Sequence, residues 1–249
     1  MNNKAVVILF LVSVMGCSTV KNELESAYLN GDKEKVKKIL SNKWKRSILI
    51  NSKLTSGMTI LELAAKNCDI EIIEFLVQKG AKFDLEEKGL LIVDFALNCP
   101  TSETLMFFLD RGLDPNDPRL LVSVIVEENL ETLSLLVDRY DLALDTNIEH
   151  GSTLLHFAAA LNNAQILEYL ISNGAEINLR NNNGDTALHI ACFGVAGKND
   201  LELKKQIRAI QVLLNHNARI SIRNNEGLTP EELARASNCN QKVISLFAE

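Results

Sequence analysis

Residues 151–159 read Gly-Ser-Thr-Leu-Leu-His-Phe-Ala-Ala, and residues 184–192 read Gly-Asp-Thr-Ala-Leu-His-Ile-Ala-Cys. The two stretches superpose without gaps and begin 33 residues apart. Related blocks, with Gly and Thr at the same positions, occupy 57–65 and 227–235. A short unit that recurs at a period of this size indicates an array of repeats, in which each unit packs against its neighbours.

Each block predicts a turn followed by a short helix. Its glycine permits the turn, its threonine caps the first helical turn, and its small alanines let neighbouring helices approach closely. A second helix is predicted after each block because apolar residues recur there at helical spacing, as in Ile166, Leu167, Leu170 and Ile171. Residues suited to a left-handed helix end then follow at Gly80, Gly112, Gly174 and Asn217.

The unit that these elements form resembles the ankyrin repeat. The resemblance rests on Thr-x-Leu-His-x-Ala at the start of the first helix and on Asn-Gly-Ala-Glu-Ile-Asn at 173–178 after the second. It is closest over 151–183 and 184–226 and good over 56–88. The less regular units span 22–50, 89–116, 117–150, where Asp117 and Pro118 start the helix, and 227–249.

This resemblance implies an all-α ankyrin-repeat solenoid over residues 22–249, built from helix pairs with short β-hairpin-like fingers. We expect about six or seven pairs, with atypical ends because terminal repeats must present a polar outer face. Since each repeat buries its apolar face only against its neighbours, the product is an extended, rigid surface. Such a surface suits protein recognition.

The beginning of the sequence predicts export. Lys4 precedes an apolar run of about ten residues, where a bilayer span needs roughly twenty. The run closes with Val14-Met15-Gly16-Cys17, which resembles the lipobox of bacterial lipoproteins. The resemblance implies a signal peptide over 1–16, lipidation of Cys17, for which palmitate is the expected label, and a tether over 17–21. Ordinary cleavage near Gly16 or Ser18 is the alternative.

The residues after Cys17 bear on the membrane. Ser18 and Thr19 stand where the inner-membrane retention signal of lipoproteins would place Asp. The resemblance therefore implies attachment to the outer membrane, facing the periplasm. Several acyl chains anchor a protein stably, because each buried methylene contributes about 0.8 kcal/mol and one chain alone is marginal.

The charge balance and the motifs argue against two classes of function. The net charge is −6, whereas phosphate backbones are bound through many Lys and Arg contacts that release counterions. There is no Gly-x-Ser-x-Gly, His-Glu-x-x-His, phosphate-binding glycine loop or Asp-rich calcium loop. The sequence therefore predicts a protein that binds no nucleic acid, is not an enzyme, and has no cofactor or small-molecule substrate.

His156 and His189 occupy the same position in successive repeats, which suggests metal binding or acid–base catalysis as one interpretation. Glu62 and Glu232 replace them in the other blocks, and a shared metal site needs three or four convergent ligands. In ankyrin repeats the histidine of this motif ties its own turn to neighbouring backbone. We therefore expect a structural role and no metal.

Four cysteines follow Cys17, in a compartment where disulfides persist: Cys68, Cys99, Cys192 and Cys239. Cys68 and Cys99 lie near corresponding inter-helix turns of adjacent repeats. Stacked helices lie about 8–10 Å apart, whereas a disulfide accepts a Cα separation of about 4.4–6.8 Å. An irregular turn at Pro100 would close that gap, so this pairing stays open. Cys192 is expected to be a buried thiol.

Two local features each allow a structural and a functional interpretation. Residues 33–46 hold seven basic residues, one acid and Trp44, which suits either a solvated cap of the first repeat or contact with anionic lipid headgroups. The repeat at 184–226 carries roughly ten extra residues between its helices, at about 194–206. They suit either tolerated surface variation or a loop on a binding face.

Family resemblance places partner contacts at the fingertips and on the exposed side of the first helices. The expected contacts are Glu149, His150, Arg180, Asn182, Arg223 and Asn225, with Phe193 as an apolar anchor. The sequence thus predicts a monomeric, membrane-anchored module for an envelope protein of unknown identity. It would act as an inhibitor or immunity protein, for which an acidic surface suits a basic target, or as a scaffold or assembly factor for an envelope enzyme or complex.

Overall fold

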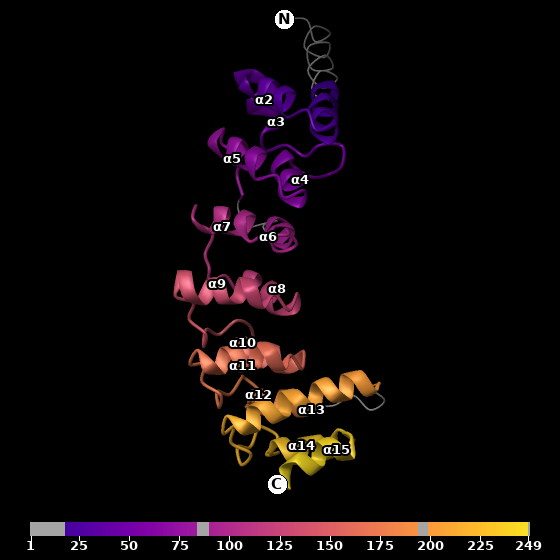
Figure 1. Cartoon of the computed structure of the whole chain (residues 1–249), viewed down its shortest axis with the longest axis vertical. Coiled ribbons are helices and arrows are strands. Elements are labelled where there is room, and N and C mark those ends of the chain that lie inside the picture. The colour runs from indigo at the N-terminus through magenta and orange to yellow at the C-terminus, as the bar shows by residue number, and fades with distance from the viewer. Residues whose placement is uncertain (1–17, 84–89, 194–198, 249) are drawn as a thin grey trace, which may run out of the picture. The chain divides into compact units, whose positions relative to one another are not determined.

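The structure is a computed structural model that describes residues 18–83, 90–193 and 199–248. Cys17 and residues 1–16, where the sequence predicts a signal peptide, therefore lie outside the described residues. The chain divides into two compact units, residues 1–112 and 113–249, and each is treated by itself below. Both consist of helices, labelled in Figure 1.

Unit 1 contains three pairs of helices and one additional helix. Residues 18–29 are helical, so the described part of the expected tether is helix. The remaining helices are α2 (Lys33–Ser41), α3 (Lys43–Leu49), α4 (Ile60–Lys66), α5 (Ile70–Gln78), α6 (Leu90–Leu97) and α7 (Glu103–Leu109). Their core is mainly aliphatic, with Leu40, Ile60, Ile73 and Leu76 fully buried, and it also contains the buried Phe108.

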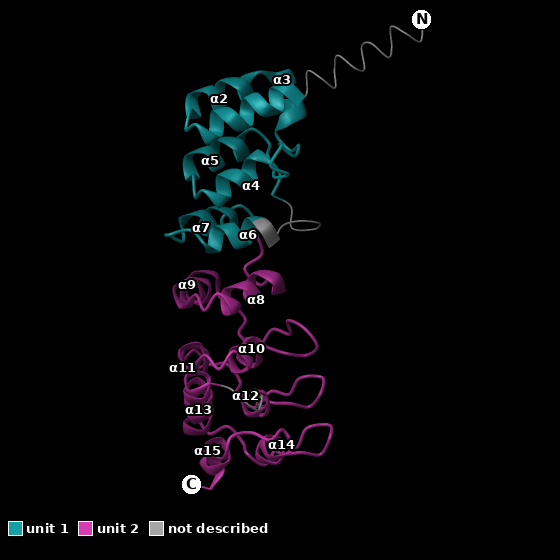
Figure 2. Ribbon diagram, turned by 90° about the vertical axis from the view of Figure 1, so that its right-hand side faces the viewer, with its two compact units in different colours: residues 1–112 teal, residues 113–249 magenta. Residues whose placement is uncertain are grey.

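Unit 2 contains four further pairs. They are α8 (Pro118–Val126) with α9 (Leu130–Tyr140), α10 (Leu154–Ala160) with α11 (Ala164–Ser172), α12 (Ala187–Cys192) with α13 (Asp200–Asn215), and α14 (Pro230–Ala236) with α15 (Gln241–Ile244), which ends in a 3₁₀ turn at Ser245–Phe247. The first helices form one layer and the second helices another (Figure 2). Ala158 and Ala191 are fully buried, which permits the close stacking of α10 on α12.

The predicted caps and helix ends are present. Thr59, Thr153, Thr186 and Thr229 begin their helices in capping boxes. The left-handed position after the second helix is occupied by Gly174, with φ +94°, and by Asn217, with φ +63°. Among the described residues the only β pairing is an isolated bridge between Glu149 and Ser152 in one finger. The prediction of an all-α array of helix pairs is therefore confirmed.

The expected insertion is not only a loop. Residues 194–198 lie outside the described part, but α13 begins at Asp200 and runs for 16 residues, whereas α11 has nine. Asn199 caps it by accepting a hydrogen bond from the Glu202 backbone amide at 2.9 Å. Leu203 and Ile210 are buried on one face. Much of the insertion therefore lengthens the second helix, because its apolar residues continue the helical spacing.

The open question about Cys68 and Cys99 is resolved in favour of a disulfide. Their Cα atoms lie 5.6 Å apart. The turn between α4 and α5 spans three residues, 67–69, whereas the turn between α6 and α7 spans five, 98–102. The longer turn brings Cys99 closer than the spacing of stacked helices would allow. Cys192 and Cys239 are free, and Cys192 is buried as expected.

Candidate protein-binding surface

The three fingers of unit 2 project on the same side of α10, α12 and α14 (Figure 2). Successive fingers are hydrogen-bonded to one another. The backbone amide of Asn182 donates to the carbonyl of His150, and that of Asn225 to the carbonyl of Asn183, both at 2.9 Å. The Asn225 side chain also donates to the Asn182 carbonyl at 2.8 Å. These bonds hold the fingertips in register.

Arg180 adds a further link between fingers. Its Nε donates to the Gly184 carbonyl at 3.1 Å, and its Nη2 donates to Oδ1 of Asn225 at 3.2 Å. Gly184 has φ +77°, and a Cβ there would lie 2.8 Å from the backbone nitrogen of Asn225. Glycine is therefore required at this position by both conformation and space.

Arg223 bonds to the first residues of the unit that follows it, 227–249. Its Nη1 donates to the Gly227 carbonyl at 2.6 Å and to Oε2 of Glu232 at 2.7 Å. The backbone amide of Thr229 and then the Arg223 guanidinium lower the pKa of the Glu232 carboxyl. The guanidinium thus braces the last finger against α14.

The two repeat histidines connect each repeat to the next. Nδ1 of His156 accepts from the Thr153 backbone amide at 3.2 Å, so Nε2 carries the proton and donates to the Asp185 carbonyl at 3.0 Å. His189 does the same with Thr186, at 3.2 Å, and with the Leu228 carbonyl, at 3.1 Å. Burial lowers the pKa of both imidazoles. Both rings therefore have the structural role that the sequence predicts.

The similarity of this chain to known proteins agrees with the stacked repeats and fingers described above. Family models of ankyrin repeats match residues 56–85, 120–202 and 183–225. The chain contains ankyrin repeats. The ankyrin repeat domain of Bcl-3, an IkappaB family member, superposes with a TM-score of 0.71 at 22% identity, over 91% of this chain and 98% of that domain.

Two bacterial ankyrin proteins are also similar. An ankyrin repeat domain from Acinetobacter baumannii AYE superposes with a TM-score of 0.60 at 22% identity, over 76% of this chain and 95% of that domain. An ankyrin repeat protein of Rickettsia felis is 28% identical over 197 residues, which are 74% of this chain and 48% of the relative. The chain spans less than half the length of the first curated relatives that it matches. These likenesses confirm the ankyrin-repeat fold.

The predicted contact residues of the ankyrin surface fall into two groups. The side chains of Arg180, Arg223 and Asn225 bond to a neighbouring finger or to the repeat that follows, and Asn182 bonds through its backbone, as described above. Glu149 and His150 instead project from the finger before α10, with side chains 65% and 83% exposed. Phe193, at the end of α12, is 61% exposed. The first group orders the fingers, and the second is free to contact a partner.

Two apolar residues of this surface were not among the predicted contacts. Phe157 of α10 and Ile190 of α12 are partly exposed and directly follow the histidine in successive repeats. Since α10 packs on α12 and Ile190 precedes Phe193 by three residues, these residues lie on the same side of the two helices. The repeat block itself indicates these two residues, because in both repeats a large apolar residue directly follows the buried histidine.

The basic block of unit 1 is partly neutralised. Lys33 pairs with Asp69 at 2.7 Å, and Lys37 with Glu71 at 2.6 Å. Trp44 is 58% exposed. The ion pairs support the interpretation as a cap of the first repeat, and contact with lipid headgroups stays a prediction.

The described residues contain neither a candidate membrane span nor a candidate metal site. No helix there is long and apolar enough to cross a bilayer. No three His, Cys, Asp or Glu side chains in the described ranges gather as metal ligands would.

Proposed function

We propose that this chain is a lipid-anchored module that binds an envelope protein. The observation that carries the proposal is the surface of unit 2, where hydrogen-bonded fingers lie beside first helices that carry the partly exposed Phe157 and Ile190 and the exposed Phe193. Rigid fingers lose little conformational freedom on binding, so more of the contact energy contributes to affinity. Partly exposed aromatic side chains supply the kind of anchor that dominates protein interfaces.

The Cys68–Cys99 disulfide supports a location outside the cytoplasm. Such bonds persist in oxidising compartments, including the bacterial periplasm, and are rare in cytosolic proteins. Together with the lipobox-like sequence before Cys17, it favours a protein held at the outer membrane and facing the periplasm. Recognition would then occur within reach of a membrane.

Within this setting the chain acts as an inhibitor or immunity protein. Its net charge of −6 favours encounter with a basic target, because complementary charge steers association. A scaffold for an envelope complex is the alternative. If the captured partner is a toxin or hydrolase that loses activity when bound, the inhibitor role is supported. If it is an envelope enzyme that stays active and assembles with others, the scaffold role replaces it.

The decisive experiment is a pull-down with lipidated protein, followed by mass spectrometry. The wild-type chain should recover a protein that Phe193→Ser recovers at least about tenfold less well, because an interface anchor contributes 2 kcal/mol or more. The matched control is Leu29→Ser, since Leu29 is 64% exposed but lies in unit 1. Equal recovery by the two variants would assign binding elsewhere, and recovery of no protein would contradict the proposal.

The anchor is tested separately by metabolic labelling with radioactive palmitate. Label should appear in the wild-type chain and disappear in Cys17→Ser. Label that persists in the variant, or that never appears, would exclude lipidation at Cys17. The binding proposal would then stand without the anchor.

A further inference from the structure

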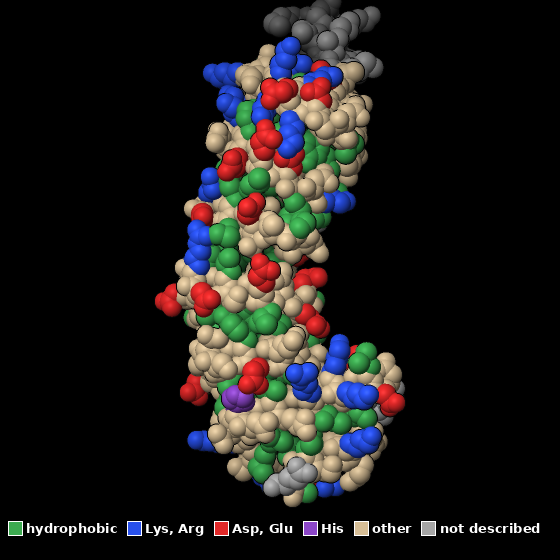
Figure 3. Space-filling model, viewed as in Figure 1, with side chains coloured by type: hydrophobic (Ala, Val, Ile, Leu, Met, Phe, Trp, Pro, Cys, Tyr) green, Lys and Arg blue, Asp and Glu red, His purple; other side chains and the backbone are tan. Residues whose placement is uncertain are grey.

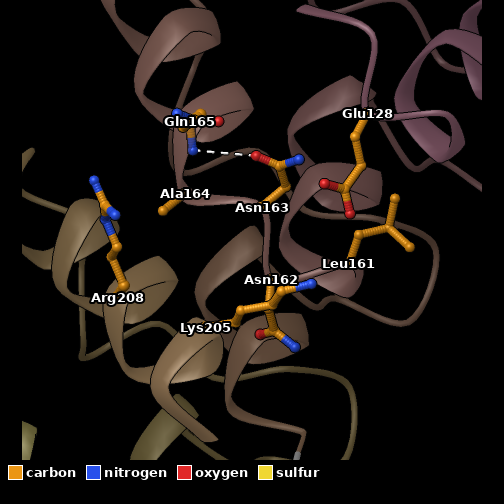
Figure 4. A pocket seen from close by; sticks show the side chains of 8 residues that line it. All are labelled: Glu128, Leu161, Asn162, Asn163, Ala164, Gln165, Lys205 and Arg208. Carbon is orange, nitrogen blue, oxygen red and sulfur yellow. Dashed lines mark hydrogen bonds between the residues drawn. The ribbon is translucent and has the colours of Figure 1, made fainter. Parts of the chain in front are cut away.

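The edge of unit 2 that carries the inter-helix turns, away from the fingers, contains a hollow of about 250 Å³. Glu128 from the turn between α8 and α9 lines it, as do residues of the turn between α10 and α11. Lys205, from the lengthened part of α13, and Arg208, which follows it by three residues, line it from the other side (Figure 4). The hollow exists because α13 extends farther than the other second helices.

The lengthened part of α13 is anchored. The Gln206 side chain is buried, and its Nε2 donates to the Ala191 carbonyl at the end of α12 at 2.8 Å. Leu203 is buried on the same side of the helix. These contacts hold the opposite face outward, so Leu201, Lys204, Lys205 and Arg208 form one exposed stripe at helical spacing. Figure 3 shows basic side chains gathered where this helix projects.

The cations of the hollow are almost unpaired. Arg208 has no ion pair or hydrogen bond from its side chain within the described ranges, and Lys205 reaches only Glu202, at 3.9 Å. In a chain with a net charge of −6, two such cations in one hollow form a local positive site. A carboxylate between them would gain charge-assisted hydrogen bonds, which are stronger than neutral ones.

The opposite wall offers acceptors. Oδ1 of Asn162, a residue that is only 8% exposed, is buried and has no hydrogen-bond partner among the residues that the structure describes. A buried acceptor without a donor is uncommon and costs free energy until a donor reaches it. Glu128, exposed on the neighbouring turn, has no ion pair in the described part of the chain. A ligand that fits both walls therefore carries carboxylates on one side and N–H donors on the other.

We propose that this hollow binds an acidic, extended segment of a protein partner. Its carboxylates face Lys205 and Arg208 on α13, and its backbone amides face Asn162 and Glu128 on the turns. The inference rests on the proposed function in one respect, that the occupant belongs to a protein. The hollow adds a second contact surface on the edge away from the fingers. One partner can therefore bind both surfaces, or two partners can bind at the same time.

The test measures binding of a fluorescein-labelled octaglutamate peptide to the purified full chain by fluorescence anisotropy. We expect Lys205→Glu combined with Arg208→Glu to weaken binding about tenfold or more, because two favourable charge contacts become repulsive. The matched control combines Lys204→Glu with Arg219→Glu. It changes the net charge equally at exposed residues that do not line the hollow, and it should alter binding less than about threefold.

A third variant tests the amide. Asn162 has φ +55°, a conformation that glycine adopts freely, so Asn162→Gly should fold while losing the side chain. It should bind the peptide about threefold less tightly, with a circular dichroism spectrum like that of the wild type. Wild-type binding by this variant would remove Asn162 from the site.

Two results would overturn the inference. One is equal weakening by the two charge-reversal pairs, which would show attraction to net charge alone. The other is no binding by the wild-type chain at about 1 mM peptide, the limit of weak recognition. Because the assay needs neither a membrane nor the native partner, its failure leaves the Phe193→Ser result standing. Failure of the pull-down likewise leaves the peptide result standing.

Discussion

The repeats of unit 2 and the central repeat of unit 1 are joined to their successors by different bonds. In unit 2, His156 and His189 each accept a hydrogen bond from their own helix cap and donate one to the next repeat. In unit 1 the same position holds Glu62, which accepts from the Thr59 amide at 2.6 Å. A carboxylate has no proton to donate, so Glu62 completes the cap but cannot make the second bond.

The disulfide joins that repeat to its successor at the opposite end of α4. Cys68 lies in the turn after α4, and Cys99 in the corresponding turn after α6. Unit 1 therefore uses one covalent link where unit 2 uses a series of weaker, repeated hydrogen bonds. The less regular unit at 89–116 is thus held to its predecessor by a disulfide, where the hydrogen bond of the histidine is missing.

The largest expected effect comes from breaking the disulfide. A cross-link over 31 residues of separation stabilises by about 3–4 kcal/mol, chiefly by restricting the unfolded chain. We expect Cys99→Ser to lower the free energy of unfolding by that amount in chemical denaturation. Reductant should destabilise the wild type equally and leave the variant unchanged. An oxidised wild type no more stable than the variant would contradict this account of unit 1.

The next effect probes the packing of fingers in unit 2. Gly184→Ala forces an alanine into a left-handed conformation and against the Asn225 backbone, and it should cost about 3 kcal/mol. Gly227 has the same φ of +77°, but its added Cβ would meet no atom within 4 Å. Gly227→Ala should therefore cost only about 1 kcal/mol. Equal midpoints in urea for the two variants would show that the fingers do not constrain each other.

A smaller effect is expected when a unit 2 repeat is given the chemistry of unit 1. His156→Glu keeps the cap but leaves the Asp185 carbonyl without its donor, so we expect a loss of about 2 kcal/mol near neutral pH. The control is Glu62→Gln, which retains an acceptor for Thr59 and should cost less than about 1 kcal/mol. Thermal unfolding of both variants measures the difference. A greater loss in the control would reverse the ranking.

The smallest effect is a dependence of stability on pH. Burial lowers the pKa of His156 and His189 below the ordinary value of 6.5, so the folded chain keeps both rings neutral where the unfolded chain binds protons. The contribution of the two neutral histidines to the free energy of unfolding is fully present above about pH 6.5. It decreases as the pH falls from that value toward their lowered pKa values in the folded chain. Replacing both by Gln should flatten the unfolding free energy between about pH 7 and 5. An unchanged slope would contradict this assignment.

The fold could be read from the sequence because its determinants are local. The threonine caps and the left-handed helix ends depend on residues within one repeat, and each recurs in the sequence. The structural role of His156 and His189 is predicted from the same recurrence, since Glu62 and Glu232 replace them in the other blocks and a metal site needs three or four convergent ligands. Family models and superposition then confirmed the ankyrin-repeat fold.

The features that the sequence does not predict depend on distances between residues that are set only when the repeats fold and stack. Arg180 and Arg223 look like free fingertip cations in the sequence, but carbonyl and side-chain acceptors lie within reach only after the chain folds. The disulfide depended on a five-residue turn whose path no residue pattern specifies. The sequence does not predict the length of α13, because an insertion between the helices of a repeat indicates a loop, although Leu203 and Ile210 continue the buried face of the helix.

The Cys68–Cys99 bridge also has a mechanical consequence. When a protein is pulled from both ends, its repeats unravel and the chain lengthens by roughly 3.3–3.6 Å for each released residue. The bridge prevents the 31-residue span that it closes from extending, so the pulled chain is shorter by roughly 100 Å than a chain without the bridge. Under load, α5 and α6 can lose their helical structure, but the pulling force bypasses the segment between the two sulfur atoms.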